Sequence, residues 1–400
     1  MHVPDGFIDA PVSAAAGVLA AAAVAVSLRG ARRELGAHGP GQDGTGQDGP
    51  DTAPGAERTA PLAGLVAAFI FAVQMLNFPV AAGTSGHLLG GALAAILVGP
   101  YTGVLCVSVV LLMQGVLFAD GGLTALGVNI TDMAVVTVLV AYGIFRGLVK
   151  VLPRGRRAVT VATFVAAAAS VPAAAVAFTG LYALGGTTDV PLGTVFAAMT
   201  GVHVLIGLGE AAITALTVGA VLAVRPDLVY GARGLSEPLQ LRSSPVARPA
   251  AQTTAREDAG EPEPKPEREP EPAAAPRPVA ARRTTRRLWL AGVAVALVCA
   301  GGLSYYASTS PDGLEKVAQD QGLDAKAEEH AAKDSPLADY GVKDIADPRI
   351  SGGLAGVIGV GATLAVGTGV FVVVRRRRGA ARDAAAGDAP APPRHTPESA

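Results

Sequence analysis

Long apolar segments separated by short polar ones fill most of the first 230 residues of the chain. About seven of them reach or approach the ~20 residues that a helix needs to cross a hydrocarbon core of ~30 Å. They lie near residues 11–28, 62–78, 87–99, 102–119, 127–146, 158–181 and 194–224. The third is short and ends at a Gly-Pro turn, so we expect a tilted or partly re-entrant helix there. The pattern predicts an all-α membrane protein whose first module, residues 1–230, is a seven-helix bundle.

Two further apolar segments, near 288–306 and 351–374, follow a long polar stretch. Residues 231–284 contain the run EPEPKPEREPEP, whose closely spaced prolines exclude helix and sheet, so we expect a disordered linker rich in Pro, Glu and Arg. Residues 285–378 are then expected to form a two-helix membrane hairpin, and residues 379–400 a disordered tail.

Residues 307–350 lie between the last two apolar segments and begin with SPDGLEKVAQDQGL. The Pro-Asp-Gly turn is a helix-start signal, and it predicts a short amphipathic helix. Its apolar positions at helical spacing are Leu314, Val317 and Ala318. The segment is acidic on balance, which either concentrates cations near the outer surface or is the ordinary charge of a solvated helix.

The composition narrows the function classes further. Half of the residues are hydrophobic and only 16% are charged, which argues against a single soluble globule. Cys106 and Cys299 both lie in apolar runs, as packing residues do, and not in a clustered thiolate metal site. No GxxxxGK[ST] loop and no convincing Ser/His/Asp or Cys/His arrangement is present, so we expect neither an enzyme nor a nucleic-acid partner.

Clusters of Lys and Arg orient the helices, because cytoplasmic loops collect basic residues. Four clusters follow apolar segments: the first (Arg29, Arg32, Arg33), the fifth (Arg146, Lys150, Arg154, Arg156, Arg157), the seventh (Arg225, Arg233) and the ninth (Arg375 to Arg378). One more cluster precedes the eighth segment (Arg282, Arg283, Arg286, Arg287). All fall on one side of a nine-span protein with its N-terminus outside and its C-terminus in the cytoplasm. Acidic Asp5 and Asp9 precede the first segment, so we expect no cleavable signal peptide. The expected location is the bacterial plasma membrane.

The chain begins with Met1 and His2, and this pair is a candidate metal site. The α-amine, the deprotonated His2 amide and a His2 ring nitrogen can chelate one ion in the tetragonal or planar nitrogen arrangement that Cu(II) and Ni(II) favour. The alternative is an initiator Met followed by an arbitrary residue. His87, in GTSGHLLGG, falls on the same outer face as a fourth nitrogen ligand, although its glycines also suit helix packing.

Four other polar residues are candidates for support of that site. His203 and Glu210, in HVLIGLGE, lie two turns apart on one helix face, and we favour pairing or a supporting role over direct ligation. Asn129 and Asp132 start the fifth segment and can orient ligand imidazoles, although helix capping explains Asp132 equally well. The remaining histidines, expected to be incidental, are His38, His330 and His395.

Three motifs together resemble one family. MHVPDGFID, NFPVAAGTSGHLLGG and HVLIGLGE look like the substrate-specific membrane component of cobalt and nickel energy-coupling factor transporters, the CbiM/NikM family, over about residues 1–230. The second half resembles the PDGLE domain, a CbiN/NikN-like unit that accompanies such components, here as a fusion. The polar stretches at 36–60 and 231–284 depart from a compact version of this pattern.

The resemblance implies a component of an ATP-driven importer that captures Co(II) or Ni(II) through Met1, His2 and His87, with no permanently bound cofactor. Its implied partners are a CbiQ/NikQ-like transmembrane coupling subunit and a CbiO/NikO-like cytoplasmic ATPase, besides membrane lipid. A metal-sensing or scaffolding membrane protein is the alternative, and a secondary transporter needing no ATPase is a third. The same nitrogen ligands serve both ions, so the sequence does not choose between cobalt and nickel.

Overall fold

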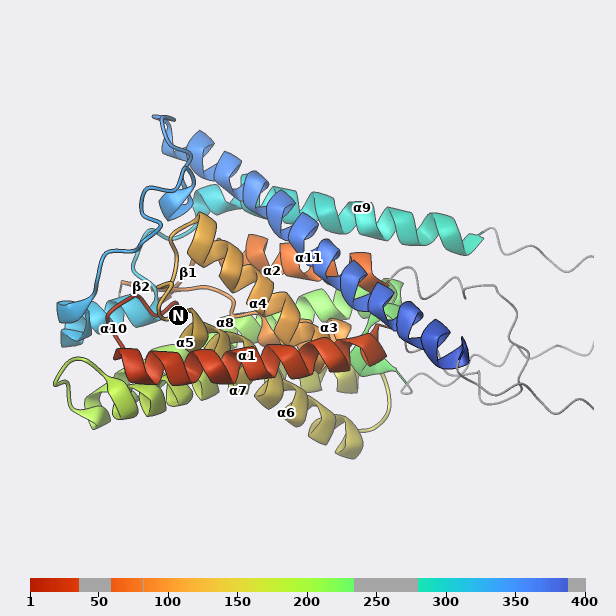
Figure 1. Ribbon diagram of the computed structural model, residues 1–400, viewed down its shortest axis with the longest axis horizontal. Coiled ribbons are helices and arrows are strands. Elements are labelled where there is room, and N and C mark those ends of the chain that lie inside the picture. Colours follow the sequence, from red (N-terminus) through yellow and green to blue (C-terminus); the bar gives the residue numbers. More distant parts are fainter. Residues whose placement is uncertain (36–58, 82, 234–279, 388–400) are drawn as a thin grey trace, which may run out of the picture.

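The computed structural model describes residues 1–35, 59–81, 83–233 and 280–387, and nearly all regular structure in them is helical (Figure 1). The helices before residue 234 are α1 (Ala10–Glu34), α2 (Thr59–Gln74), α3 (Gly91–Val98), α4 (Pro100–Leu117), α5 (Leu126–Asn129), the π-helix η2 (Ile130–Val136), α6 (Thr137–Val151), α7 (Arg156–Gly185) and α8 (Leu192–Val224). Those after residue 279 are α9 (Ala280–Gly301), α10 (Gly313–Gln321) and α11 (Pro348–Gly387). Short 3-10 turns join several of these helices.

Within the described residues, seven helical stretches are long and apolar enough to cross a membrane. They are α1, α4, the continuous stretch α5–η2–α6, α7, α8, α9 and α11. The helices of the second and third predicted spans are too short to be counted among these seven, because α2 has 16 residues and α3 only 8. Every residue of α3 is buried, so protein rather than lipid surrounds this half-length helix. The third segment is therefore the partial helix that its short apolar run indicated.

Two further details differ from the sequence predictions. The stretch between α2 and α3, for which no strand was predicted, forms a small antiparallel hairpin of β1 (Phe78–Ala81) and β2 (Thr84–Gly86). The first residues of the predicted disordered tail, 379–387, are helical, because the Arg- and Ala-rich sequence continues α11 with good helix formers. The rest of the tail, the 36–58 part of the polar loop, residues 234–279 of the linker, His38 and His395 lie outside the described residues.

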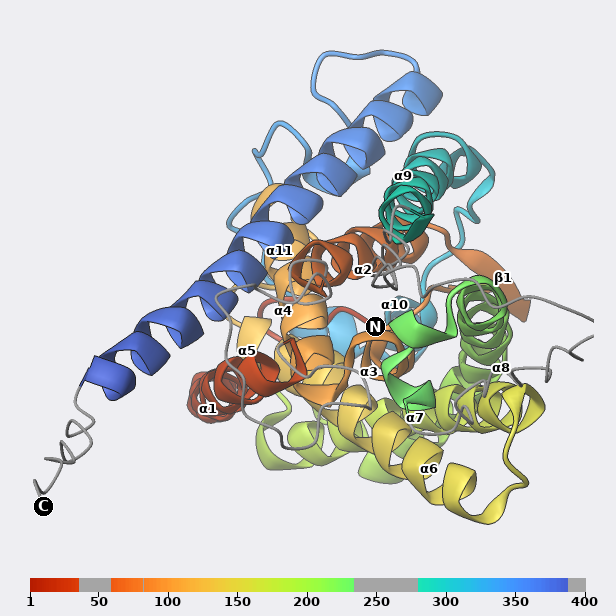
Figure 2. The same cartoon turned by 90° about the vertical axis from the view of Figure 1, so that its right-hand side faces the viewer.

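The second module packs along α2, which lies beside both α9 and α11 (Figure 2). Glycines make the close approach possible: a Cβ built on Gly64 of α2 would lie 2.3 Å from the Thr368 hydroxyl of α11, and one on Gly292 of α9 would lie 2.7 Å from Leu65. Small residues of this kind let membrane helices approach without a hydrophobic driving force. The two modules therefore form one bundle.

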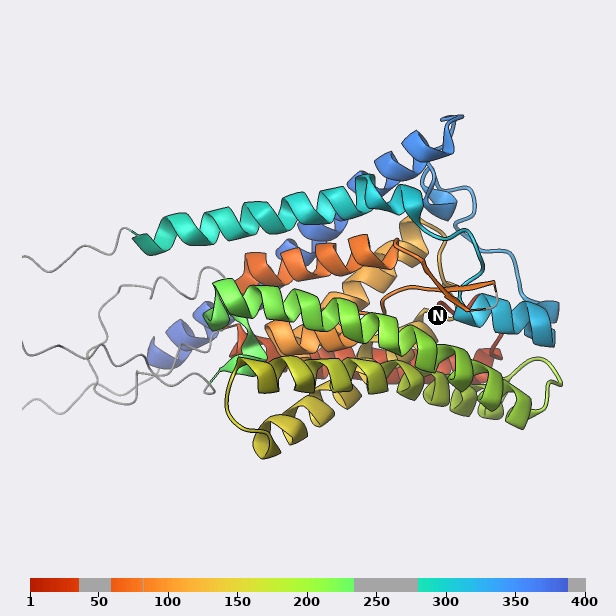
Figure 3. The same cartoon turned by 180° about the vertical axis from the view of Figure 1, so that it is seen from behind.

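The segment that joins α9 to α11 folds over one end of the first module. It holds α10, which lies against α8, as Figure 3 shows from behind. As predicted, Leu314, Val317 and Ala318 are the buried face of α10. Met1 lies at this same end, whereas α1 and α11 end, and α9 begins, at the opposite end (Figure 1).

Candidate metal centre

The first nine residues form a buried strap that leads from α1 into the interior. Asp9 caps α1 by accepting a hydrogen bond from Val12 N at 2.9 Å. Nearer the chain start, Asn129 holds the backbone of Val3 on both sides, accepting from its N–H at 2.7 Å and donating to its carbonyl at 3.1 Å. Met1 is only 2% exposed. The strap thus fixes where the two preceding residues lie.

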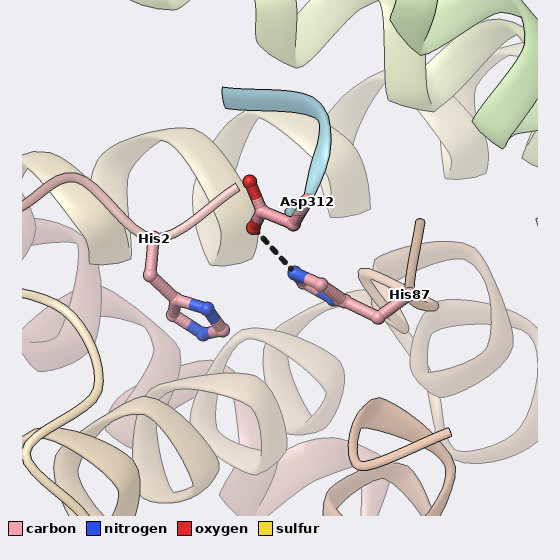
Figure 4. Close-up of side chains that lie close together, drawn as sticks. All are labelled: His2, His87 and Asp312. Carbon is pink, nitrogen blue, oxygen red and sulfur yellow. Dashed lines mark ion pairs between the residues drawn. The ribbon is translucent and has the colours of Figure 1, made fainter. Parts of the chain in front are cut away.

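Three groups meet around the nitrogen of Met1. This nitrogen lies 2.6 Å from His87 Nε2 and 2.8 Å from Asp312 Oδ2, and the latter two atoms lie 3.4 Å apart. His87 Nδ1 lies 3.1 Å from the Leu88 carbonyl, and His87 Nε2 faces both the Met1 nitrogen and Asp312 Oδ2. Figure 4 shows His87 and Asp312 converging from separate elements, with His2 beside them.

The imidazole of His2 is stacked on that of His87, with ring centroids 5.0 Å apart and planes at 19°. Its Nε2 lies 3.1 Å from Gln114 Oε1 and its Nδ1 lies 3.2 Å from Asp120 Oδ1. Burial lowers the pKa of His2 to about 4, although Asp120 acts in the opposite direction. The ring is therefore neutral at physiological pH, which is the form that binds a metal.

Asp312 belongs to the second module, and sequence reasoning treated it only as part of a helix-start signal. It is indeed the N-cap of α10, where Oδ1 accepts from Glu315 N at 2.8 Å and Glu315 closes a capping box. Its other oxygen faces Met1. Burial favours the neutral acid, but the Met1 ammonium and the neighbouring His87 outweigh it and hold the pKa of Asp312 well below its usual range. The sequence pattern that predicts a helix start does not indicate what the second carboxylate oxygen contacts.

The segment that carries His87 is held by Glu210 of α8. This buried carboxylate accepts hydrogen bonds from Leu89 N at 2.7 Å and Gly90 N at 3.1 Å. Gly90 has φ +86°, and a Cβ there would lie 2.6 Å from Ile70, so glycine is needed both for the conformation and for the packing. Glu210 thus sets the position of His87 through the backbone that follows it.

Of the roles expected for the other candidates, a supporting role fits Glu210, whereas its pairing with His203 and the roles of Asn129 and Asp132 differ from expectation. His203 Nδ1 bonds to the Met199 carbonyl at 2.7 Å, and Glu210 uses both oxygens for backbone N–H groups, so the two do not pair with each other. Asn129 binds the backbone of Val3 and not an imidazole. Asp132 neither caps a helix nor orients an imidazole: it lies in the π-helical turn, and its buried oxygens have no hydrogen-bond partner among the described residues.

A pocket of about 730 Å³ opens above the three converging groups. Four carboxylates and one arginine are among the side chains that line it: Asp120, Asp312, Glu315, Asp339 and Arg349. His330, expected to be incidental, lies beside this end of the fold, with Nε2 3.1 Å from the Gly121 carbonyl. Residues of both modules line this pocket, and His2 and His87 are among them.

The separations around Met1 are those of direct hydrogen bonds and ion pairs, and the shortest of them are also close to the spacing of ligands that share one ion. Nitrogen and oxygen ligands bind transition metals at ~2 Å, so two adjacent ligands at right angles lie ~2.8 Å apart. The Met1–His87 distance of 2.6 Å fits this value, and the ligand atoms of His2, His87 and Asp312 all lie within 4.8 Å of one another. Imidazole nitrogens and an amine favour Ni(II), Cu(II) and Co(II) over Mg²⁺ or Ca²⁺.

Comparison with known proteins gives matches over both modules. Residues 51–228 match the family described as the cobalt uptake substrate-specific transmembrane region (CbiM), and residues 286–376 match the PDGLE domain. A putative metal transport protein of Haloquadratum walsbyi is 40% identical over 230 residues, which are 58% of this chain and 94% of that protein. A putative fused nickel transport protein, NikMN, of Archaeoglobus fulgidus is 37% identical over 231 residues, 57% of this chain and 68% of the relative.

A crystal structure of a transition metal transporter matches with 27% identity and a TM-score of 0.44, covering 56% of this chain and 93% of the other. The family is one of uptake components and not of enzymes. With its apolar helices, the chain is an all-α, multi-pass membrane protein. It belongs to the CbiM family of cobalt-uptake membrane components, in a form that carries a PDGLE domain as its second module.

Proposed function

We propose that this chain is the substrate-binding membrane subunit of an ATP-driven, energy-coupling factor importer for cobalt or nickel ions. The observation that carries the proposal is the convergence of the Met1 nitrogen and His87 Nε2 at 2.6 Å, with the His2 ring stacked on that of His87. The family description names cobalt, and the relative from Archaeoglobus fulgidus is named for nickel. Both ions suit the nitrogen ligands.

In this proposal Met1, His2 and His87 bind the ion, while Asn129 and Glu210 position them. Asn129 holds the strap at Val3, and Glu210 holds the backbone that follows His87. The ion exchanges its water for these ligands in the pocket. A CbiQ/NikQ-like coupling subunit and a CbiO/NikO-like ATPase then supply the movement that releases it inward.

We place the site on the external side of the membrane. Met1 and α10 lie at one end of the bundle, whereas Arg32 and Arg33 end α1 and Arg286 begins the apolar part of α9 at the other (Figure 1). Basic residues mark the cytoplasmic side. The external medium is also where an importer meets its substrate.

Labelling of single cysteines tests this orientation. Asp324 is exposed at the site end and Lys150 is exposed at the end of α6, while the native Cys106 and Cys299 are buried. We expect a membrane-impermeant maleimide to label Asp324→Cys in intact cells and Lys150→Cys only after permeabilisation. The reverse pattern would place the site in the cytoplasm.

Transport in proteoliposomes tests the function itself. We expect ATP-dependent uptake of radioactive nickel only when this chain is reconstituted with the coupling subunit and the ATPase, and binding without uptake when it is alone. Uptake by the chain alone would show a secondary transporter. Binding that the complete assembly never converts into uptake would favour the sensing or scaffolding alternative.

A further inference from the structure

The PDGLE domain contributes one group to the site, and its position matches that of a metal ligand. Asp312 Oδ2 lies 2.8 Å from the Met1 nitrogen and 3.4 Å from His87 Nε2. Adjacent ligands of one ion are separated by ~2.8 Å; the separation from the Met1 nitrogen equals this value, and the separation from His87 Nε2 is wider. The carboxylate oxygen is therefore placed as a neighbour of both nitrogens.

We propose that Asp312 is an oxygen ligand of the transported ion, supplied by the PDGLE domain beside the nitrogen ligands of the first module. The inference rests on the proposed function, because it concerns the same ion. Four planar positions suffice for the Met1 amine, the His2 amide, a His2 ring nitrogen and His87. An oxygen adjacent to both the amine and His87 then takes an axial position.

Charge gives a further argument from the same contact. The Asp312 side chain is 17% exposed, and its Oδ2 forms an ion pair with the Met1 nitrogen. A largely buried carboxylate is costly without a cationic partner, and a divalent ion bound beside Met1 and His87 would be such a partner.

The local structure holds Asp312 in place for this role. Its Oδ1 is fixed by the N–H of Glu315 in the capping box of α10. The residue before it is tied to the first module, because Ser85 N of β2 donates to the Pro311 carbonyl at 2.9 Å. Ser85 Oγ also donates to the Ser310 carbonyl at 2.7 Å. The PDGLE turn is therefore clamped against the segment that leads to His87.

Nickel K-edge X-ray absorption and calorimetric titration of the purified full chain test the inference. We compare the unmodified protein with Asp312→Asn, which keeps an N-cap side chain, with Asp312→Ala, and with the control Asp324→Asn. Asp324 is exposed in the same domain. We expect both Asp312 variants to bind nickel more weakly, by at least the ~10-fold that loss of a supporting residue costs, and the control to bind normally.

The spectrum separates a ligand from a merely structural residue. We expect the unmodified protein to lack the pre-edge feature of planar four-coordinate nickel, and both Asp312 variants to gain it. A planar spectrum in the unmodified protein would overturn the inference even if the variants failed to fold. Unchanged spectra in both variants would do the same. A protein that binds no nickel at all contradicts the proposed function instead, which keeps the two failures distinct.

Discussion

A single residue added ahead of Met1 is expected to abolish metal uptake while the protein still inserts into the membrane. The addition turns the Met1 amine into a peptide nitrogen, which lacks the free lone pair of an amine. It also has little room, because Met1 is 2% exposed and its nitrogen already contacts His87 and Asp312. Uptake of radioactive nickel by cells that express the complete transporter measures the effect.

Uptake is the correct measurement for this variant. A histidine at the third position of a free chain end can chelate nickel with its own backbone nitrogens, so binding alone would mislead. The matched control carries the same residue added after Ala400, and we expect it to transport normally. Normal uptake by the N-terminally extended protein would remove the Met1 amine from the site.

Replacement of His87 by Ala is expected to weaken nickel and cobalt binding by more than ~100-fold. Loss of a residue that only supports a ligand typically costs ~10- to 100-fold, and His87 offers its Nε2 directly, 2.6 Å from the Met1 nitrogen. Calorimetric titration of the purified full chain gives the affinity. Thermal unfolding shows whether the variant keeps its fold.

Added imidazole provides the internal control for His87→Ala. The substitution leaves a space next to the pocket, whose volume is about 730 Å³. Free imidazole can reach the ion through this pocket. We expect millimolar imidazole to restore part of the lost affinity, which a misfolded protein would not allow. An affinity equal to that of the unmodified protein would show that His87 is not a ligand.

The helical stretches could be located from sequence because apolar runs report the membrane directly. The same signal does not distinguish a spanning helix from a short one buried by protein, as α3 shows. The hairpin of β1 and β2 was not predicted, because FPVAAGTSG carries glycine and proline where a strand pattern would alternate. α11 continues to Gly387 because the residues that follow its apolar run are good helix formers.

The site shows a different limit. Met1, His2 and His87 could be assigned to one membrane face from basic clusters and the order of helices. Asp312 could not, since it is 225 residues from His87 and its place in the site depends on how the second module packs on the first. Gln114 and Asp120 belong to the first module, and they were missed because their contact with His2 depends on how the end of α4 packs against the start of the chain. The Pro-Asp-Gly pattern already accounted for Asp312 as the residue that starts α10, so nothing in the sequence indicated a second role.

Roles that depend on a hydrogen-bond partner were the least predictable part. Asn129 and Glu210 contribute to the site, but through the backbones of Val3, Leu89 and Gly90 and not through the imidazoles. Backbone N–H groups carry no residue identity, so no pattern in the sequence indicates which of them a buried side chain will bind.

Anomalous diffraction at the nickel absorption edge, from crystals of the full chain loaded with nickel, would show whether Met1, His2 and His87 bind the ion. We expect one strong peak at ~2 Å from the Met1 nitrogen, a His2 nitrogen and His87 Nε2. A peak elsewhere in the protein, or loaded crystals in which these three residues surround no ion, would contradict this expectation.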